Sequence, residues 1–131
     1  MDEWDTLSER GYGAWTRGDL DGFLAVLAPD LVFRTAGLFP GLRDEYFGHD
    51  GVREFWGQMR DPFESFAIEP VRIERHGTDA AVIDIKFRAV GKGSGARVEL
   101  DFFHAARKRA GLVTVLSSHS TREEALAALT T

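Results

Sequence analysis

The segment Gly48–Trp56, with the sequence GHDGVREFW, says most about how this chain folds. From its middle onward, apolar residues recur at the i, i+3, i+4 and i+7 spacing of one buried helix face. These residues are Val52, Phe55, Trp56 and Met59. The spacing predicts a helix over Gly48–Arg60 that packs one side against the rest of the protein.

Two segments upstream predict a short helix and a strand. In GDLDGF, which begins at Gly18, Asp19 can cap the first turn of a helix that we expect to end before Pro29. The following PDLVFR leads into a strand over Leu31–Thr35. A first helix over Asp2–Arg17 precedes these segments, and Ala36–Tyr46 reads as an irregular connection rich in glycine and proline.

The second half of the chain predicts four strands and a closing helix. Turn residues separate strand-like runs at Phe66–His76, Ala80–Val90, Arg97–Arg107 and Leu112–Ser118. Thr121 can cap the final helix, because Glu124 lies three residues later as in a capping box. Helices followed by a run of antiparallel strands are typical of the α+β class, and we expect one domain over residues 1–131.

Composition argues against several classes of function. The chain has 131 residues and a net charge of −5, which disfavours binding to nucleic acid. It has no cysteine and its four histidines lack metal-binding spacing, so we expect no disulfide, no metal and no cofactor. The acidic N-terminus and the absence of a long apolar run predict a cytoplasmic protein without a membrane segment.

The order and spacing of these segments resemble the SnoaL-like branch of the nuclear-transport-factor-2-like superfamily. The resemblance covers nearly the whole chain and includes GKGSG at residues 91–95 and REEAL at residues 122–126. It implies a cone-shaped, cystatin-like domain in which helices cover a strongly curved, mostly antiparallel sheet. It also implies a ligand pocket between the helices and the sheet, as in ketosteroid isomerases and polyketide cyclases.

Three positions depart from the related enzymes. By similarity to ketosteroid isomerases, the general base would stand at Thr35 and the tyrosine oxyanion donor at Gly11. By similarity to limonene-epoxide hydrolases, an aspartate would stand at Ser118. Neither inherited mechanism keeps its central residue, although Thr35 and Ser118 remain candidates for substrate binding.

The strand over Arg97–Arg107 carries the remaining candidate catalytic residues, Asp101 and His104, on opposite faces. Hydrophobicity predicts that the face with His104 is buried. The resemblance predicts instead that Phe103 faces the pocket, which would bring Asp101 with it. A bulge in the strand could exchange the two faces. In an apolar pocket, desolvation would shift the pKa of either group toward neutrality, where acid–base catalysis is efficient.

Aromatic residues from three separate elements form the candidate binding wall. With the positions named above, the predicted substrate-binding set is Tyr12, Trp15, Phe33, Thr35, Phe55, Trp56, Phe103 and Ser118. By similarity, Trp15 and Trp56 border the pocket. Such a wall favours a flat or hydrophobic ligand over a polar one.

Two hypotheses about function follow. The first is an isomerase- or cyclase-type enzyme that uses acid–base chemistry on a hydrophobic metabolite. The alternative is a non-catalytic ligand-binding or dimerisation module with a vestigial pocket. In either case the late strands carry apolar residues on both faces, which predicts a homodimer formed through the outer face of the sheet.

Overall fold

The computed structural model describes residues 2–35, 37–39 and 41–130. Part of the predicted connection, at Ala36 and Pro40, lies outside these residues. Within the described part, the elements follow one another in the order α1 (Glu3–Arg17), α2 (Leu20–Leu24), β1 (Leu27–Arg34), β2 (Glu45–Phe47), α3 (Gly48–Arg60), β3 (Phe63–His76), β4 (Ala80–Gly91), β5 (Arg97–Arg109), β6 (Leu112–His119) and α4 (Arg122–Ala128).

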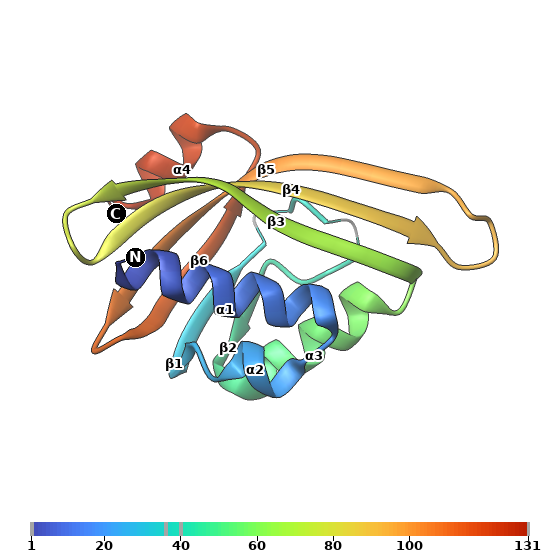
Figure 1. Cartoon of the computed structure of the whole chain (residues 1–131), viewed down its shortest axis with the longest axis horizontal. Coiled ribbons are helices and arrows are strands. Elements are labelled where there is room, and N and C mark those ends of the chain that lie inside the picture. Colours follow the sequence, from blue (N-terminus) through green and yellow to red (C-terminus); the bar gives the residue numbers. More distant parts are fainter. Residues whose placement is uncertain (1, 36, 40, 131) are drawn as a thin grey trace.

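The six strands form one curved sheet in the order β2-β1-β6-β5-β4-β3. Its neighbours are antiparallel except for the parallel pair of β1 and β6. Helix α1 lies across one face of the sheet with α2 and α3 beside it, while α4 lies on the opposite face (Figure 1). This arrangement confirms the predicted α+β cone.

The first strand begins earlier than the sequence predicts. Helix α2 ends at Leu24, and Leu27 already belongs to β1 rather than to the helix. The backbone N–H of Val113 in β6 donates to the carbonyl of Val26, at 2.9 Å. Pairing with a distant strand therefore ends the helix, and Pro29 lies where the register of β1 with β6 shifts.

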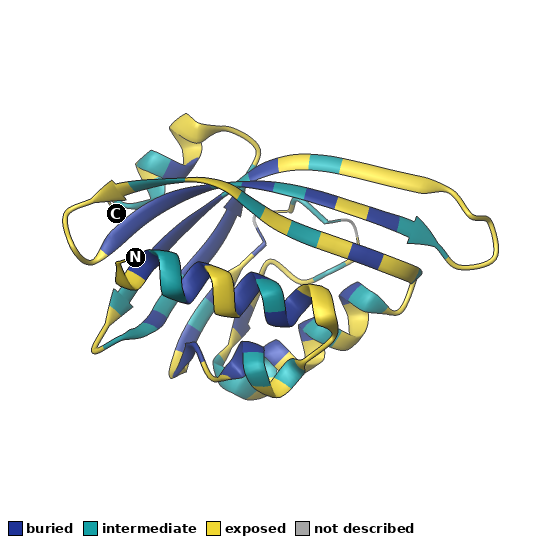
Figure 2. Cartoon of the chain, viewed as in Figure 1, coloured by how far each residue is buried: buried dark blue, intermediate teal, exposed yellow. Residues whose placement is uncertain are grey.

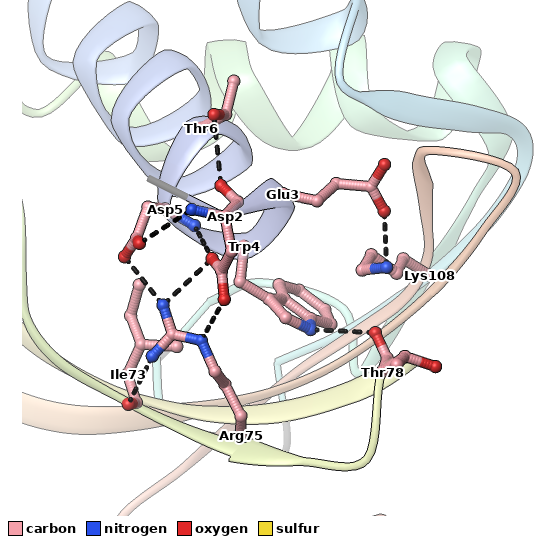
Figure 3. A network of polar contacts seen from close by, with 9 residues as sticks. All are labelled: Asp2, Glu3, Trp4, Asp5, Thr6, Ile73, Arg75, Thr78 and Lys108. Carbon is pink, nitrogen blue, oxygen red and sulfur yellow. Dashed lines mark hydrogen bonds and ion pairs between the residues drawn. The ribbon is translucent and has the colours of Figure 1, made fainter.

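The start of α1 is fixed to the sheet by a network of polar contacts (Figure 3). Asp2 caps the helix by accepting from the N–H of Asp5, and the Arg75 side chain from β3 bonds to both carboxylates. Hydrogen bonding to Arg75 holds the pKa of Asp2 well below its usual range. The indole N–H of Trp4 donates to the carbonyl of Thr78, at 3.2 Å. These contacts set the position of α1, which carries part of the candidate site.

The core lies on the inner face of the sheet, between the sheet and helices α1 to α3 (Figure 2). In β4, residues Ile83, Ile85 and Phe87 belong to it. A second, smaller cluster lies on the outer face, where Ala125 of α4 covers Val82 and Ala105. Val82 and Ala105 on the outer face therefore have a partner within the chain. The predicted homodimer stays a prediction, because α4 accounts for part of the pattern that suggested it.

In the described part of the chain, no helix is long and apolar enough to cross a membrane.

Candidate functional site

A small cavity lies between the helices and the inner face of the sheet, with a volume of about 30 Å³. Helices α1, α2 and α3, the connection after β1 and five strands contribute to its wall. The lining residues are Tyr12, Trp15, Phe23, Phe33, Phe39, Phe55, Met59, Ile68, Phe87, Phe102, His104, Leu116 and Ser118. Eight of these thirteen carry a phenyl, phenol or indole ring, and none carries a carboxylate, an ammonium or a guanidinium group.

The structure brings together six of the ten residues predicted for the site. They come from α1, β1, α3, β5 and β6, and they are Tyr12, Trp15, Phe33, Phe55, His104 and Ser118. The other four, Thr35, Trp56, Asp101 and Phe103, do not line this cavity.

Strand β5 presents the face that hydrophobicity predicts. Its pairing with β4 runs without a register shift from Arg107 to Arg97, so no bulge exchanges the faces. Phe102 and His104 face the cavity, whereas Phe103 packs beneath α4 on the outer face. Asp101 shares that outer face and is exposed. The expectation that Phe103 faces the pocket is wrong for this chain, because α4 gives its ring an apolar partner outside the cone.

Thr35 and Trp56 have other contacts. Thr35 is fully buried, but its hydroxyl donates to the carbonyl of Arg43, at 2.8 Å, and so holds the connection after β1 in place. Trp56 is half-buried and packs its ring edge-on against Trp15, with 4.3 Å between ring centroids. It supports the wall from behind. The expectation that both tryptophans border one cavity holds for Trp15 only.

Tyr12 and His104 form the polar centre of the cavity. The phenol oxygen of Tyr12 lies 2.6 Å from Nδ1 of His104, and the two rings are nearly parallel, with 13° between their planes. Both side chains are buried, with 8% and 4% of their surface exposed. When both are neutral, the phenol and the imidazole together carry two protons on oxygen or nitrogen, and one of these lies in the hydrogen bond between the two side chains. The pair therefore keeps one further N–H or O–H donor, on whichever ring holds the second proton.

Burial keeps both members of the pair neutral. Desolvation lowers the pKa of His104 to about 3, with a smaller contribution from nearby His119, and desolvation raises the pKa of Tyr12 above its ordinary value. From the sequence, desolvation is expected to move the pKa of a pocket histidine toward neutrality. The shift instead carries His104 far below it, because no carboxylate among the lining residues offsets the loss of water. At pH 7 His104 is a neutral hydrogen-bonding group.

Two further polar atoms of the wall lack a hydrogen-bond partner among the described residues. They are Nε1 of Trp15 and Oγ of Ser118, on residues that are 4% and 0% exposed. Ser118 pairs with His104 across β5 and β6, so its hydroxyl lies on the same face as the Tyr12–His104 pair. Buried polar groups without partners are rare in folded proteins and cost about 1–3 kcal/mol each. Both residues line the cavity.

A family model for the SnoaL-like domain matches residues 8–116. The chain belongs to the SnoaL-like family. A search among curated proteins gives no match for this SnoaL-like protein. Among solved structures, an NTF2-like protein of unknown function from Burkholderia pseudomallei is 25% identical, with a TM-score of 0.80 over 100% of both chains.

Two further structures share the fold at lower identity. TerC, co-crystallised with polyporic acid, is 20% identical, with a TM-score of 0.79 over 99% of this chain and 100% of its own. A Mycobacterium tuberculosis protein in complex with estradiol-17β-hemisuccinate is 16% identical, with a TM-score of 0.74 over 94% of this chain and 97% of its own.

Seven lining residues of this SnoaL-like protein are not among those predicted from the sequence. They are Phe23, Phe39, Met59, Ile68, Phe87, Phe102 and Leu116. Strand alternation was a signal for Phe102, which shares a face with His104, and helix spacing was a signal for Met59. Phe39 had no such signal, because it lies in an irregular connection. Its ring reaches Phe102 edge-on, with 5.6 Å between centroids.

The described residues contain no group of three or more histidine, aspartate and glutamate side chains able to hold a metal ion. Apart from His104 and Ser118, the residues that line the cavity carry aromatic rings or aliphatic side chains. What this wall can do chemically is enclose an apolar ligand, hydrogen-bond to it, and exchange a proton through the Tyr12–His104 pair.

Proposed function

We propose that this SnoaL-like protein binds a hydrophobic small molecule in the cavity between α1, α3 and the sheet. The observation that carries the proposal is the wall itself, in which eight aromatic rings surround a few buried polar atoms. Small-molecule sites in proteins have this composition, with apolar area for affinity and a few polar groups for orientation. Two structural neighbours were solved with small molecules, polyporic acid and an estradiol derivative, which supports the same use of the fold.

A titration with N-phenyl-1-naphthylamine tests this proposal, because this uncharged probe fluoresces strongly only away from water. The matched variants are Ile68→Trp and Val71→Trp on the same strand. Ile68 lines the cavity, whereas the side chain of Val71 is 53% exposed. We expect the parent and Val71→Trp to bind the probe and Ile68→Trp to bind it at least about ten-fold more weakly. Equal binding by all three, or by none, would contradict a ligand cavity at this place.

The contact between Tyr12 and His104 favours a second candidate, an isomerase- or cyclase-type enzyme. At 2.6 Å the phenol and the imidazole can pass a proton between them within an apolar site. Because the pKa of His104 is about 3, the imidazole alone is a weak base at neutral pH. Catalysis would therefore use the pair as a unit that gives one proton to the substrate and takes another from it.

A turnover screen on hydrophobic ketones and polyketide-like compounds tests this candidate. We expect His104→Gln and Tyr12→Phe each to lower turnover by about 100-fold or more if the pair transfers the proton. Asp101→Asn is the matched control, since Asp101 is exposed on the outer face. If the parent binds ligands but turns none over, or if both pair variants react like the parent, the non-catalytic binding module is the better account.

A further inference from the structure

A second hollow lies on the outer face of the sheet, apart from the cavity described above. It is an open pocket of about 530 Å³, and residues of β1, β2, β6 and α4 contribute to its wall. Arg34, Glu45, Ser117 and His119 supply its polar groups together with Asp44. None of its described lining residues lines the inner cavity. A role for this outer pocket therefore does not depend on the proposed function.

Strand pairing places three of these side chains on one face. Arg34 in β1 is the partner of Ser117 in β6, and Ser117 is also the partner of Ala105 in β5. Ala105 belongs to the outer cluster beneath α4, so Ser117 and Arg34 face outward as well. His119 follows two residues after Ser117 and shares its face, whereas Ser118 between them lines the inner cavity.

Ser117 and His119 form a hydrogen-bonded pair in the outer pocket. The Oγ atom of Ser117 lies 2.7 Å from Nε2 of His119. Desolvation lowers the pKa of His119 below its ordinary value of 6.5, and this effect outweighs the opposing charge of Glu124. At pH 7 the imidazole is therefore mostly neutral, and Nε2 can accept the hydroxyl proton when the ring proton is on Nδ1. A hydroxyl that donates to a neutral imidazole is the arrangement that activates serine as a nucleophile.

Arg34 supplies a positive charge beside this pair. Its Nε donates to a carboxylate oxygen of Glu45 in β2, at 3.0 Å. This bond uses one of the five N–H donors of a guanidinium group. Because Arg34 and Ser117 are strand partners and line the same pocket, the other donors can stabilise negative charge on a substrate oxygen at Ser117.

We propose that the outer pocket hydrolyses short-chain carboxylic esters. Ser117 is the nucleophile, His119 is the general base, and Arg34 stabilises the negative charge on the carbonyl oxygen. Ser117 is only 3% exposed although it lines the pocket, so its hydroxyl lies at the floor. A slender acyl group can reach that floor, whereas a bulky one would be stopped by the pocket walls.

The reaction has two steps, and water is the second substrate. In the first step, Oγ of Ser117 bonds to the carbonyl carbon while its proton moves to Nε2 of His119. The ester C–O bond then breaks, and the departing alkoxide takes this proton and leaves as the alcohol. In the second step, water adds to the acyl group on Ser117 and gives one proton to Nε2. The bond from Oγ to the acyl carbon breaks, Oγ takes the proton back, and the carboxylic acid leaves.

Hydrolysis of p-nitrophenyl acetate tests the activity, because the release of p-nitrophenol is followed by its absorbance. We expect Ser117→Ala and His119→Gln each to lower the protein-dependent rate by about 100-fold or more. The matched controls are Ser120→Ala and His76→Gln, since both residues are exposed and lie outside the outer pocket. Their rates should equal that of the parent. A parent no faster than buffer, or a folded Ser117→Ala as fast as the parent, would overturn the proposal.

Covalent labelling identifies the nucleophile directly. Diisopropyl fluorophosphate forms a P–O bond to an activated serine and loses fluoride, and mass spectrometry of proteolytic peptides locates the label. We expect the label on Ser117 in the parent, and at least about ten-fold less of it in His119→Gln. This measurement uses the parent, so it decides the question even if Ser117→Ala does not fold. Label on another residue instead, or no label at all, would overturn the assignment to Ser117.

Ser118→Ala separates the outer pocket from the inner cavity. Its side chain lines the inner cavity, next to Ser117 in the sequence but on the opposite face. We expect Ser118→Ala to hydrolyse the ester at the rate of the parent. Hydrolysis that disappears in Ser118→Ala and survives in Ser117→Ala would place the reaction in the inner cavity and refute the proposal.

Discussion

Replacing His104 by glutamine should remove a specific part of the dependence of protein stability on pH. In the folded protein His104 has a pKa of about 3, because its ring is buried against Tyr12 and Phe102. In the unfolded chain the imidazole is in water and has its ordinary pKa of 6.5. Between these two values the unfolded chain binds a proton that the folded protein does not. Folding stability therefore falls as the pH is lowered below 6.5 and stops falling near 3.

The size of the effect between pH 7.5 and pH 5.0 follows from the pKa of the unfolded chain. At pH 5.0 the solution is one and a half units below 6.5, and each unit contributes about 1.36 kcal/mol. The parent should lose about 2 kcal/mol through this residue alone. The result does not depend on the exact folded pKa, provided that it lies well below 5. The paired carboxylates Asp2 and Glu74 add little in this range, because their lowered pKa values reduce stability mainly below the ordinary values of 3.8 and 4.5, and both of these lie under pH 5.

Urea unfolding followed by tryptophan fluorescence measures this loss at both pH values. His104→Gln keeps a polar side chain that can bond to Tyr12, and its stability should fall by about 2 kcal/mol less than that of the parent over the same interval. His119→Gln is the matched control. His119 also has a lowered pKa, but it is half-buried, so this variant should keep most of the pH dependence. If His104→Gln loses as much stability as the parent, His104 is not buried as a neutral ring and the account of the cavity fails.

Three other perturbations have defined outcomes. Phe39→Ala should lower stability by about 1–2 kcal/mol, which is less than for a fully buried phenylalanine. The same change should tighten the binding of an aromatic ligand, because the Phe39 ring no longer occupies space in the cavity. Calorimetric titration checks this, and weaker binding would count against it. Ala125→Asp should lower stability by about 2–4 kcal/mol in the same urea assay, because it places a carboxylate between α4 and the sheet. The stability of the control Ala127→Asp, on the exposed side of α4, should stay within about 0.5 kcal/mol of that of the parent. Light scattering at micromolar concentration tests the predicted homodimer, which a monomeric mass would contradict.

Local signals in the sequence predicted most of the fold. The bounds of α3 agree with the predicted Gly48–Arg60, and Asp19 and Thr121 cap their helices through side-chain oxygens as expected. These features depend on residues within a few positions of one another, so the sequence contains them directly. The start of β1 at Leu27 could not be predicted in this way, because a strand more than 80 residues away decides it.

For strand β5, hydrophobic alternation predicted the cavity face correctly, and similarity to related enzymes predicted the opposite face. Hydrophobic alternation along β5 placed His104 inside the cone, and the structure agrees. Similarity to ketosteroid isomerases placed Phe103 there instead, and this failed because α4 covers the outer face of β5 in this chain. The contact between Tyr12 and His104 joins residues that are 92 positions apart, and no local sequence pattern predicts it.

The absence of acids from the lining of the described cavity has a measurable consequence for ligand binding. A carboxylate at Ser118, as in limonene-epoxide hydrolases, would be fully buried on the sheet. Gly11 stands where ketosteroid isomerases place a tyrosine, but even a methyl group on Gly11 would come within 3.2 Å of Val26. The polar pair of the cavity therefore stays neutral, since the pKa of His104 is about 3 and that of Tyr12 is raised. Neither group changes its charge between pH 5 and pH 9, so the affinity for an uncharged ligand should be constant over this range. Titrations of N-phenyl-1-naphthylamine at five pH values check this, and an affinity that changes more than three-fold around pH 6 to 7 would mean that an ionising group faces the ligand, which would favour the acid–base enzyme over the binding module.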